Sequence, residues 1–250
     1  MDLTLLPRSL DAGGLARHPL IRSTRAGQTR GRKIRLLWHD GPERPLAKHG
    51  LALCEESGVW RLERHAPEGD ETWPPGLDHR LVETASGPKA LTRLPSGTTP
   101  EDLAPLAAFE GRRTVFPLIV GGAPVTLTLM HGALRMGEDI WPAARLRLEG
   151  PEAAVCAQAL VLGQGLDMSV STRGLVAEAL ARTGGPVPAP DWRGAPGPMT
   201  RGLSVTEAFA HVLGHLTGVL LLLAPLWRIP PADRNRCIRC ASPRAGRVRR

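Results

Sequence analysis

The chain lacks a hydrophobic run long enough to cross a bilayer. Such a span needs about 20 apolar residues, and the most apolar stretch, residues 216–227, is shorter and has an amphipathic pattern. We therefore expect a buried helix there and no membrane partner. The first residues also lack a basic segment, and Pro7 and Arg8 interrupt their apolar stretch, so we expect no secretory signal.

Cysteine and aromatic residues are scarce as well: the 250 residues include four cysteines, 4% aromatics and no tyrosine. Cys54 and Cys156 stand alone in apolar or strand-like segments, which is typical of reduced core thiols. Cys237 and Cys240 have the spacing of half a zinc site, but no second pair lies within reach, and we interpret them as a chance pair. Reduced thiols and the missing signal together favour the cytoplasm.

Acidic residues are fewer than basic ones, and most of the net difference lies at the C-terminal end of the chain. The formal net charge is +8, yet residues 228–250 hold eight arginines against one acid, Asp233. The body that precedes this tail is therefore nearly neutral. The basic isoelectric point describes the tail, and it does not predict a specific nucleic-acid partner.

The residues that are present form a pattern of strands followed by helices. Alternating residues and glycine turns predict strands over residues 50–54, 59–64, 113–120, 124–130 and 144–148, with turns at Gly121-Gly122 and His131-Gly132. Helices are predicted over residues 151–163 and 173–182, and a capping box, Ser204-Val205-Thr206-Glu207, starts another that runs to about residue 223. This order favours an antiparallel α+β domain followed by a helical segment.

Several of these segments, taken in order, resemble the CYTH family, the triphosphate-tunnel domain of the inorganic triphosphatases. The matching runs are Trp38-His39-Asp40-Gly41-Pro42, Gly50-Leu51-Ala52-Leu53, Arg113-Thr114-Val115-Phe116, Arg145-Leu146-Arg147-Leu148-Glu149-Gly150 and Ser169-Val170-Ser171-Thr172-Arg173-Gly174. The match covers roughly residues 1–183, and the ordered set carries it. The resemblance implies an α+β fold, with an antiparallel β tunnel or barrel, flanking helices and one further C-terminal helix.

In that family, Lys and Arg side chains that face into the tunnel bind phosphate oxygens, and carboxylates hold Mg²⁺ or Mn²⁺. This sequence departs from the family at most of those positions. Asp2 remains from an N-terminal motif of two acids and a lysine, whereas Arg145 and Arg147 replace a late acidic pair. Further replacements are Cys54-Glu55-Glu56 for an arginine pair, His65 and Val170 for lysines, and Met130 for an aspartate. Because arginines would repel a metal ion, the resemblance implies anion binding without the activator of hydrolysis.

The resemblance leaves a short set of candidate site residues. The candidate phosphate ligands are Arg112, Arg113, Arg145, Arg147 and Arg173, and the candidate metal ligands are Asp2 and Glu149. No residue is assigned a catalytic role, and Mg²⁺ or Mn²⁺ is expected only if the family's activity survives. A slip of one residue in a strand exchanges its two faces, so a solvated face remains an alternative for Arg145 and Arg147.

The helix that begins near Leu203 resembles the opening of a CHAD domain, a helical partner often fused behind CYTH domains and associated with polyphosphate. The resemblance lies in Ser204-Val205-Thr206-Glu207-Ala208-Phe209, whereas the basic motif of that family does not follow. Codons allowed for residues 233–243 permit the motif in a shifted reading frame, so our hypothesis is a truncated CHAD start with a frameshifted tail. We divide the chain into a CYTH-like domain (1–185), a Pro- and Gly-rich linker (186–202), a CHAD-like start (203–227) and a basic tail predicted to be disordered (228–250).

Three hypotheses about function follow. The first is a degenerate relative of the inorganic triphosphatases that binds triphosphate or polyphosphate with little or no hydrolysis. The second is a non-functional remnant of a CYTH–CHAD protein. The third is a weak metal-dependent triphosphatase that takes its acids from Glu55, Glu56 or Glu149. Convergence of the arginines on one cavity would favour the first, and an orphan helix after residue 203 would favour self-association through its apolar face.

Overall fold

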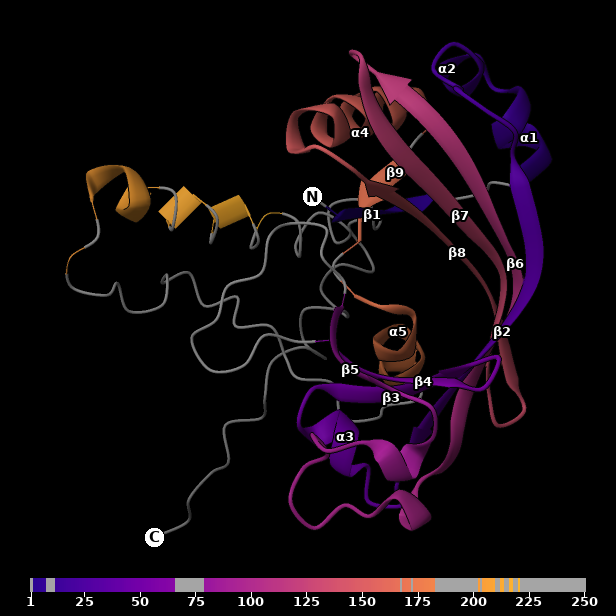
Figure 1. Ribbon diagram of the computed structural model, residues 1–250, viewed down its shortest axis with the longest axis vertical. Helices are drawn as coiled ribbons and strands as arrows, with labels where there is room; N and C mark the ends of the chain where they lie inside the picture. The colour runs from indigo at the N-terminus through magenta and orange to yellow at the C-terminus, as the bar shows by residue number, and fades with distance from the viewer. Residues whose placement is uncertain are drawn as a thin grey trace, which may run out of the picture. The chain divides into compact units, whose positions relative to one another are not determined.

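Figure 1 shows the computed structural model of the chain, which describes residues 2–7, 12–65, 79–166, 168–171, 173–182, 202, 204–209, 212–213, 216–217 and 220. The chain groups into two compact units, Met1–Pro190 and Asp191–Arg250. Cys237, Cys240 and the basic tail lie outside the described residues. The division into domains, the CHAD-like start and the shifted reading frame therefore stay predictions.

The first unit alternates strands with short helices. Its strands are β1 (Asp2–Pro7), β2 (Arg30–Asp40), β3 (Leu51–Glu56), β4 (Val59–Arg64), β5 (Arg80–Ala85), β6 (Ala104–Val120), β7 (Ala123–Met136), β8 (Asp139–Glu149) and β9 (Met168–Val170). Its α-helices are α1 (Ala12–Arg17), α2 (Pro19–Arg22), α3 (Pro45–Lys48), α4 (Glu152–Gly165) and α5 (Leu175–Arg182). Two 3-10 helices, η1 (Pro88–Ala90) and η2 (Pro100–Asp102), precede β6.

The strands form one antiparallel sheet in the order β5-β4-β3-β2-β6-β7-β8-β1-β9. Figure 1 shows this sheet curling around α5. Among the described strands, β5 and β9 are the edges, so the sheet is a half-barrel. The predicted α+β fold with an antiparallel, tunnel-like sheet and flanking helices is confirmed.

The long strands β6, β7 and β8 bury opposite faces in their two halves. On one face, Phe116 and Leu127 pack with side chains of α1, α2 and α4. On the opposite face, Phe109 and Leu134 pack with α5. Phe109 and Phe116 differ by an odd number of positions, and so do Leu127 and Leu134, so alternation alone sends them to different sides. Beyond the contact with α5, the same face of the sheet has no packed core among the described residues. The cavity described below opens there.

The turns follow the glycines, with one exception. Gly121 and Gly122 have positive φ angles of 57° and 83° and connect β6 to β7 as predicted. The predicted turn at His131-Gly132 is wrong, because β7 continues to Met136. Gly132 instead lies opposite Gly111 of β6, and a Cβ atom on Gly132 would lie 2.2 Å from the Glu110 carbonyl oxygen. The glycine pair therefore permits a close approach of two strands.

The second unit contains the predicted capping box. The Ser204 hydroxyl accepts a hydrogen bond from the Glu207 amide at 3.3 Å, and the Glu207 carboxylate accepts one from the Ser204 amide at 2.8 Å. Phe209 and Leu220 are exposed large apolar side chains of this segment. In the described part of the chain, no helix has both the length and the apolar character that a membrane span needs.

Replacing Gly132 with alanine should destabilise the first unit. The new methyl group would collide with the backbone of Glu110 and Gly111, and forcing such a group into a packed site costs about 1–3 kcal/mol. Urea unfolding followed by circular dichroism measures the loss. The matched control is Gly163→Ala in α4, where an added Cβ meets nothing within 4 Å and helix propensity predicts no loss or a gain of up to about 1 kcal/mol. Equal stability of the two variants would contradict the close approach.

Candidate anion-binding cavity

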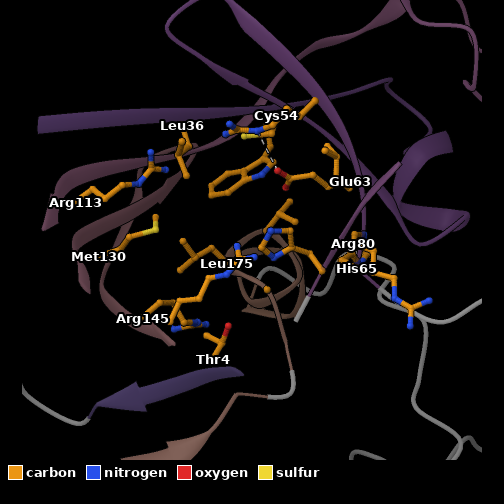
Figure 2. Close-up of a pocket in the computed structure, with 17 residues that line it drawn as sticks. Thr4, Leu36, Cys54, Glu63, His65, Arg80, Arg113, Met130, Arg145 and Leu175 are labelled. Atoms are coloured by element: carbon orange, nitrogen blue, oxygen red, sulfur yellow. Dashed lines mark ion pairs between the residues drawn. The ribbon is translucent and has the colours of Figure 1, made fainter. Parts of the chain in front are cut away.

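The face of the sheet that carries α5 encloses a cavity of about 550 Å³. Figure 2 shows Arg113, Met130 and Arg145 along one wall, with Glu63 and Arg80 across from them. The residues that line it are Thr4, Leu36, Trp38, Cys54, Arg61, Glu63, His65, His79, Arg80, Leu81, Arg113, Met130, Arg145, Arg147, Gly174, Leu175 and Val176. Five of these are arginines and one is a carboxylate, so the wall is strongly enriched in cations.

Strand register explains why arginines from distant parts of the sequence meet on this wall. Arg113 of β6 pairs with Met130 of β7, and Met130 pairs with Arg145 of β8. Arg147, two residues further along β8, pairs with Thr4 of β1. Cross-strand partners point to the same side of a sheet, so this row of four strands presents its cations on one face.

The opposite wall comes from the hairpin of β3 and β4. Cys54 pairs with Arg61, and Glu63 follows two positions later on the same face. Burial, with a further contribution from the Glu63 carboxylate, raises the pKa of the Cys54 thiol to about 12. Burial also lowers the pKa of His65, whose Nε2 lies 3.1 Å from the Leu51 carbonyl oxygen. At neutral pH the thiol is therefore protonated and His65 is uncharged.

Glu56 holds three arginines at the edge of this cavity. Its side chain is 5% exposed and accepts hydrogen bonds from Arg32 at 2.8 Å, Arg61 at 2.8 Å and Arg113 at 2.7 and 3.1 Å. We call these four residues the Glu56 cluster. Burial alone would raise the pKa of Glu56, but the hydrogen bonds from Arg61 and Arg113 outweigh it and hold the pKa below its ordinary value.

A second carboxylate ties the other wall to α5. Glu178 pairs with Arg145, and it also accepts a hydrogen bond from Arg182 at 2.7 Å. Arg145 is only 8% exposed at its side chain and donates a further hydrogen bond to the Arg173 carbonyl oxygen at 3.5 Å. Burial alone would raise the pKa of Glu178, but the charge and hydrogen bonds of Arg145 and Arg182 lower it. The position of α5 and that of a cavity arginine are therefore coupled.

The structure brings together three of the five arginines predicted to bind phosphate. Arg113, Arg145 and Arg147 line the cavity. Arg112 is exposed and lies on the other face of β6, where its guanidinium covers Gly31. The Arg173 side chain is exposed and does not line the cavity. Its carbonyl oxygen contributes to the site by accepting hydrogen bonds from Arg145 and Ser171.

The two predicted metal ligands are not brought together at the cavity. The backbone of Asp2 pairs with that of Glu149, but the Asp2 side chain lies outside the described part of the chain. Glu149 is 42% exposed and lies 3.5 Å from Arg147. In the described residues, no group of three or more His, Cys, Asp or Glu side chains could hold a metal ion. These residues therefore do not fit the divalent cation that the family resemblance implies.

The acids of the third hypothesis are placed elsewhere as well. Glu55 faces away from the cavity and lies 3.3 Å from His39 Nε2. Glu56 is held by three arginines, and Glu149 lies beside Arg147. Glu63 is the one carboxylate among the residues that line the cavity, and it lies 3.4 Å from Arg61.

Sequence reasoning missed Arg61, Glu63 and Arg80. For β4 a signal was present: Arg61 and Glu63 alternate in a strand whose hairpin partner contains Cys54, a position already assigned to the tunnel. Arg80 gave no signal, because it begins a strand that the sequence pattern did not predict.

Comparisons with known proteins give a likeness of architecture. No protein-family model matches the chain, and no curated protein matches it. Similar solved structures include a candidate adenylyl cyclase from Hippeastrum described by a dominant triphosphatase activity, with 13% identity over 75% of this chain and 97% of that chain and a TM-score of 0.46. Others are a candidate adenylate cyclase from Bacillus halodurans (13% identity, 71% and 95% covered, TM-score 0.38) and the PH1819 protein from Pyrococcus horikoshii (14%, 73% and 99%, 0.38). These scores and identities are too low to assign an activity to this chain.

Substituting Glu178 with glutamine should weaken the link between β8 and α5 in a pH-dependent way. A hydrogen bond to a charged group contributes roughly 1–3 kcal/mol, so Glu178→Gln should lower the free energy of unfolding by about that amount at pH 7. The folded-state pKa of Glu178 lies below the ordinary glutamate value of 4.5, so this contribution is present above pH 4.5 and is lost as the pH falls through the folded-state pKa.

Urea unfolding at pH 7, 5 and 3 measures both effects. Glu138→Gln is the control, because Glu138 is exposed in the turn between β7 and β8 and its loss should change stability by less than about 0.5 kcal/mol. A deficit of Glu178→Gln that stays constant down to pH 3 would show that the ion pair is not its cause.

Proposed function

We propose that the cavity binds a short phosphate chain, inorganic triphosphate or polyphosphate, and hydrolyses it slowly or not at all. The observation that carries this proposal is the convergence of five arginines on one cavity whose lining includes a single carboxylate. Guanidinium groups match phosphate oxygens with pairs of parallel hydrogen bonds and stay charged at all relevant pH values.

The spacing of the arginines favours a chain of phosphates over a single one. Arg113 and Arg145 stand on strands separated by β7, and two inter-strand spacings amount to about 10 Å. A single phosphate would contact one side of such a wall, whereas a linear polyanion can contact both sides. Two buried donors of the wall, Arg145 Nε and Trp38 Nε1, have no hydrogen-bond partner among the described residues. A phosphate oxygen is an acceptor, and it would become their partner if the neighbouring side chains moved to admit it.

The chemistry of the same wall argues against fast hydrolysis. The described residues offer no carboxylate group for a divalent cation, Cys54 keeps its proton, and the Nε2 atom of His65 is engaged by a carbonyl oxygen. Glu63, the one carboxylate in the lining, lies 3.4 Å from Arg61 and has no second carboxylate beside it in the lining with which to share a metal ion. The resemblance to the CYTH triphosphatases supports the same interpretation, since five of the positions at which this sequence departs from that family, Cys54, His65, Met130, Arg145 and Arg147, line the cavity, whereas Glu56 and Val170 do not.

The proposal includes few partners beyond the anion. We propose a cytoplasmic protein without a membrane partner or a specific nucleic-acid partner. Exposed apolar side chains of the second unit, such as Val205 and Phe209, are consistent with self-association. The CHAD-like continuation and its association with polyphosphate remain a hypothesis about the gene.

Titration calorimetry of the full chain with tripolyphosphate, with and without Mg²⁺ or Mn²⁺, tests the proposal together with an assay of phosphate release. Binding without release is the expected result. Metal-dependent release at an appreciable rate would favour the third hypothesis and a search for other carboxylates. Neither binding nor release would favour the non-functional remnant.

Arg147→Gln should weaken tripolyphosphate binding about tenfold, since a charged hydrogen bond contributes roughly 1.5 kcal/mol. Arg147 lies in the cavity wall, and its side chain is 34% exposed, so the substitution should leave the fold intact. Arg112→Gln is the matched control: it removes the same charge from the opposite face of β6, and its affinity should stay within about twofold of the parent. Equal losses in both variants would indicate non-specific attraction by net charge.

A further inference from the structure

In the Glu56 cluster, a carboxylate accepts hydrogen bonds from arginines that could also bind a ligand anion. Four adjacent strands contribute one charged side chain each: Arg61 from β4, Glu56 from β3, Arg32 from β2 and Arg113 from β6. Two of the three arginines, Arg61 and Arg113, also line the cavity. The cluster is therefore part of the cavity wall, although Glu56 itself is not among the residues that line the cavity.

Alternation along β3 fixes the direction of Glu56. Cys54 lines the cavity, and Glu56, two positions later, points to the same side. Glu55 points to the other side, toward His39. Ser57 and Gly58 follow at once with positive φ angles of 53° and 80°, so Glu56 is the last residue of the strand before a tight turn.

The contacts of Glu56 are the contacts that a phosphate would make. Both terminal nitrogens of Arg113 donate to its two carboxylate oxygens, at 2.7 and 3.1 Å, and Arg61 donates at 2.8 Å. A fork of two parallel hydrogen bonds is the arrangement in which arginine binds either a carboxylate or a phosphate. A ligand oxygen can use these donors only by sharing them with Glu56 or by displacing it.

We propose that Glu56 is an internal competitor that occupies the donors of Arg61 and Arg113 and thereby lowers the affinity of the cavity for phosphate chains. This inference rests on the proposed function, and it adds the residue that limits the affinity of the cavity for phosphate chains. A purely structural role, in which Glu56 only relieves the repulsion among three arginines, makes the opposite prediction. Under that role, removing the carboxylate disorders the arginines and weakens binding.

Titration calorimetry with tripolyphosphate in metal-free buffer separates the two roles. Glu56→Gln keeps the shape of the side chain and removes its charge, and it should tighten binding about tenfold or more, a change of roughly 1.4 kcal/mol. Glu55→Gln removes the same charge from the neighbouring position on the other face and should change affinity by less than about twofold. Weaker or unchanged binding by folded Glu56→Gln would overturn the proposal.

A double-mutant cycle identifies the donors. In an Arg113→Gln background, Glu56→Gln should tighten binding less than about threefold, because the Arg113 donors for which Glu56 and the ligand compete are then absent. An undiminished gain would mean that Glu56 acts through the general charge of the cavity, and the proposed competition for Arg113 would be wrong.

The remaining outcomes distinguish this inference from the proposed function. If Glu56→Gln binds and the natural chain does not, the inference stands and the proposed function fails for the natural chain. If neither binds, both fail. Thermal unfolding by circular dichroism checks the fold, and if Glu56→Gln does not fold, the double variant Glu56→Gln/Arg32→Gln is tested against the same criteria. It restores the net charge of the cluster by removing an arginine that lies outside the cavity lining.

Discussion

The hairpin of β6 and β7 cannot bury the same face along its whole length, and the rest of the first unit depends on this constraint. Successive side chains of a strand point to opposite sides, and a curled sheet offers a packing partner to each side over only part of the strand. Phe116 faces α4 and its neighbours, whereas Phe109 faces α5. The change of buried face occurs around the Gly111–Gly132 pair. Arg113 follows that point on the α5 side, where no core fills the space, and it is thereby available to a cavity.

The cations of the cavity are tolerated because carboxylates are distributed among them. Guanidinium groups held close together repel one another, and in a partly buried site that repulsion is screened less than in water. Glu56 compensates Arg61 and Arg113, Glu178 compensates Arg145, and Glu149 lies near Arg147. If the cavity binds a polyanion as proposed, the same pairs reduce the attraction that the anion experiences. In that case, stability of the empty cavity and affinity for the anion oppose each other.

The fold class, five of the nine described strands and three of the five arginines of the cavity followed from the sequence. The strands over 113–120, 124–130 and 144–148 were predictable because they alternate, but their full lengths were not, since Gly132 reads as a turn until its partner Gly111 is known. Arg113, Arg145 and Arg147 were found because they occupy alternate positions that a family resemblance assigned to a tunnel. Arg112 was predicted as a phosphate ligand beside Arg113, because sequence alone does not reveal which of two adjacent arginines points inward. Arg61 could have been found from its place opposite Cys54 in the predicted hairpin. The role of Glu56 depends on contacts among four strands, which no local pattern encodes.

If Arg145 and Arg147 stand where the CYTH family has carboxylates, as the resemblance implies, they change the kind of ligand that such a wall favours. A carboxylate-rich wall binds a triphosphate through a metal ion, so the metal and the anion support each other's binding. A wall of guanidinium groups needs no metal to meet the anion's charge. Metal ions in solution then reduce the charge of the free ligand before it arrives, so metal and cavity compete for the same phosphate oxygens. Under the proposed function, the sign of the metal's effect on affinity would therefore depend on the wall itself, to which Arg145 contributes a buried cation held between Glu178 and the Arg173 carbonyl group.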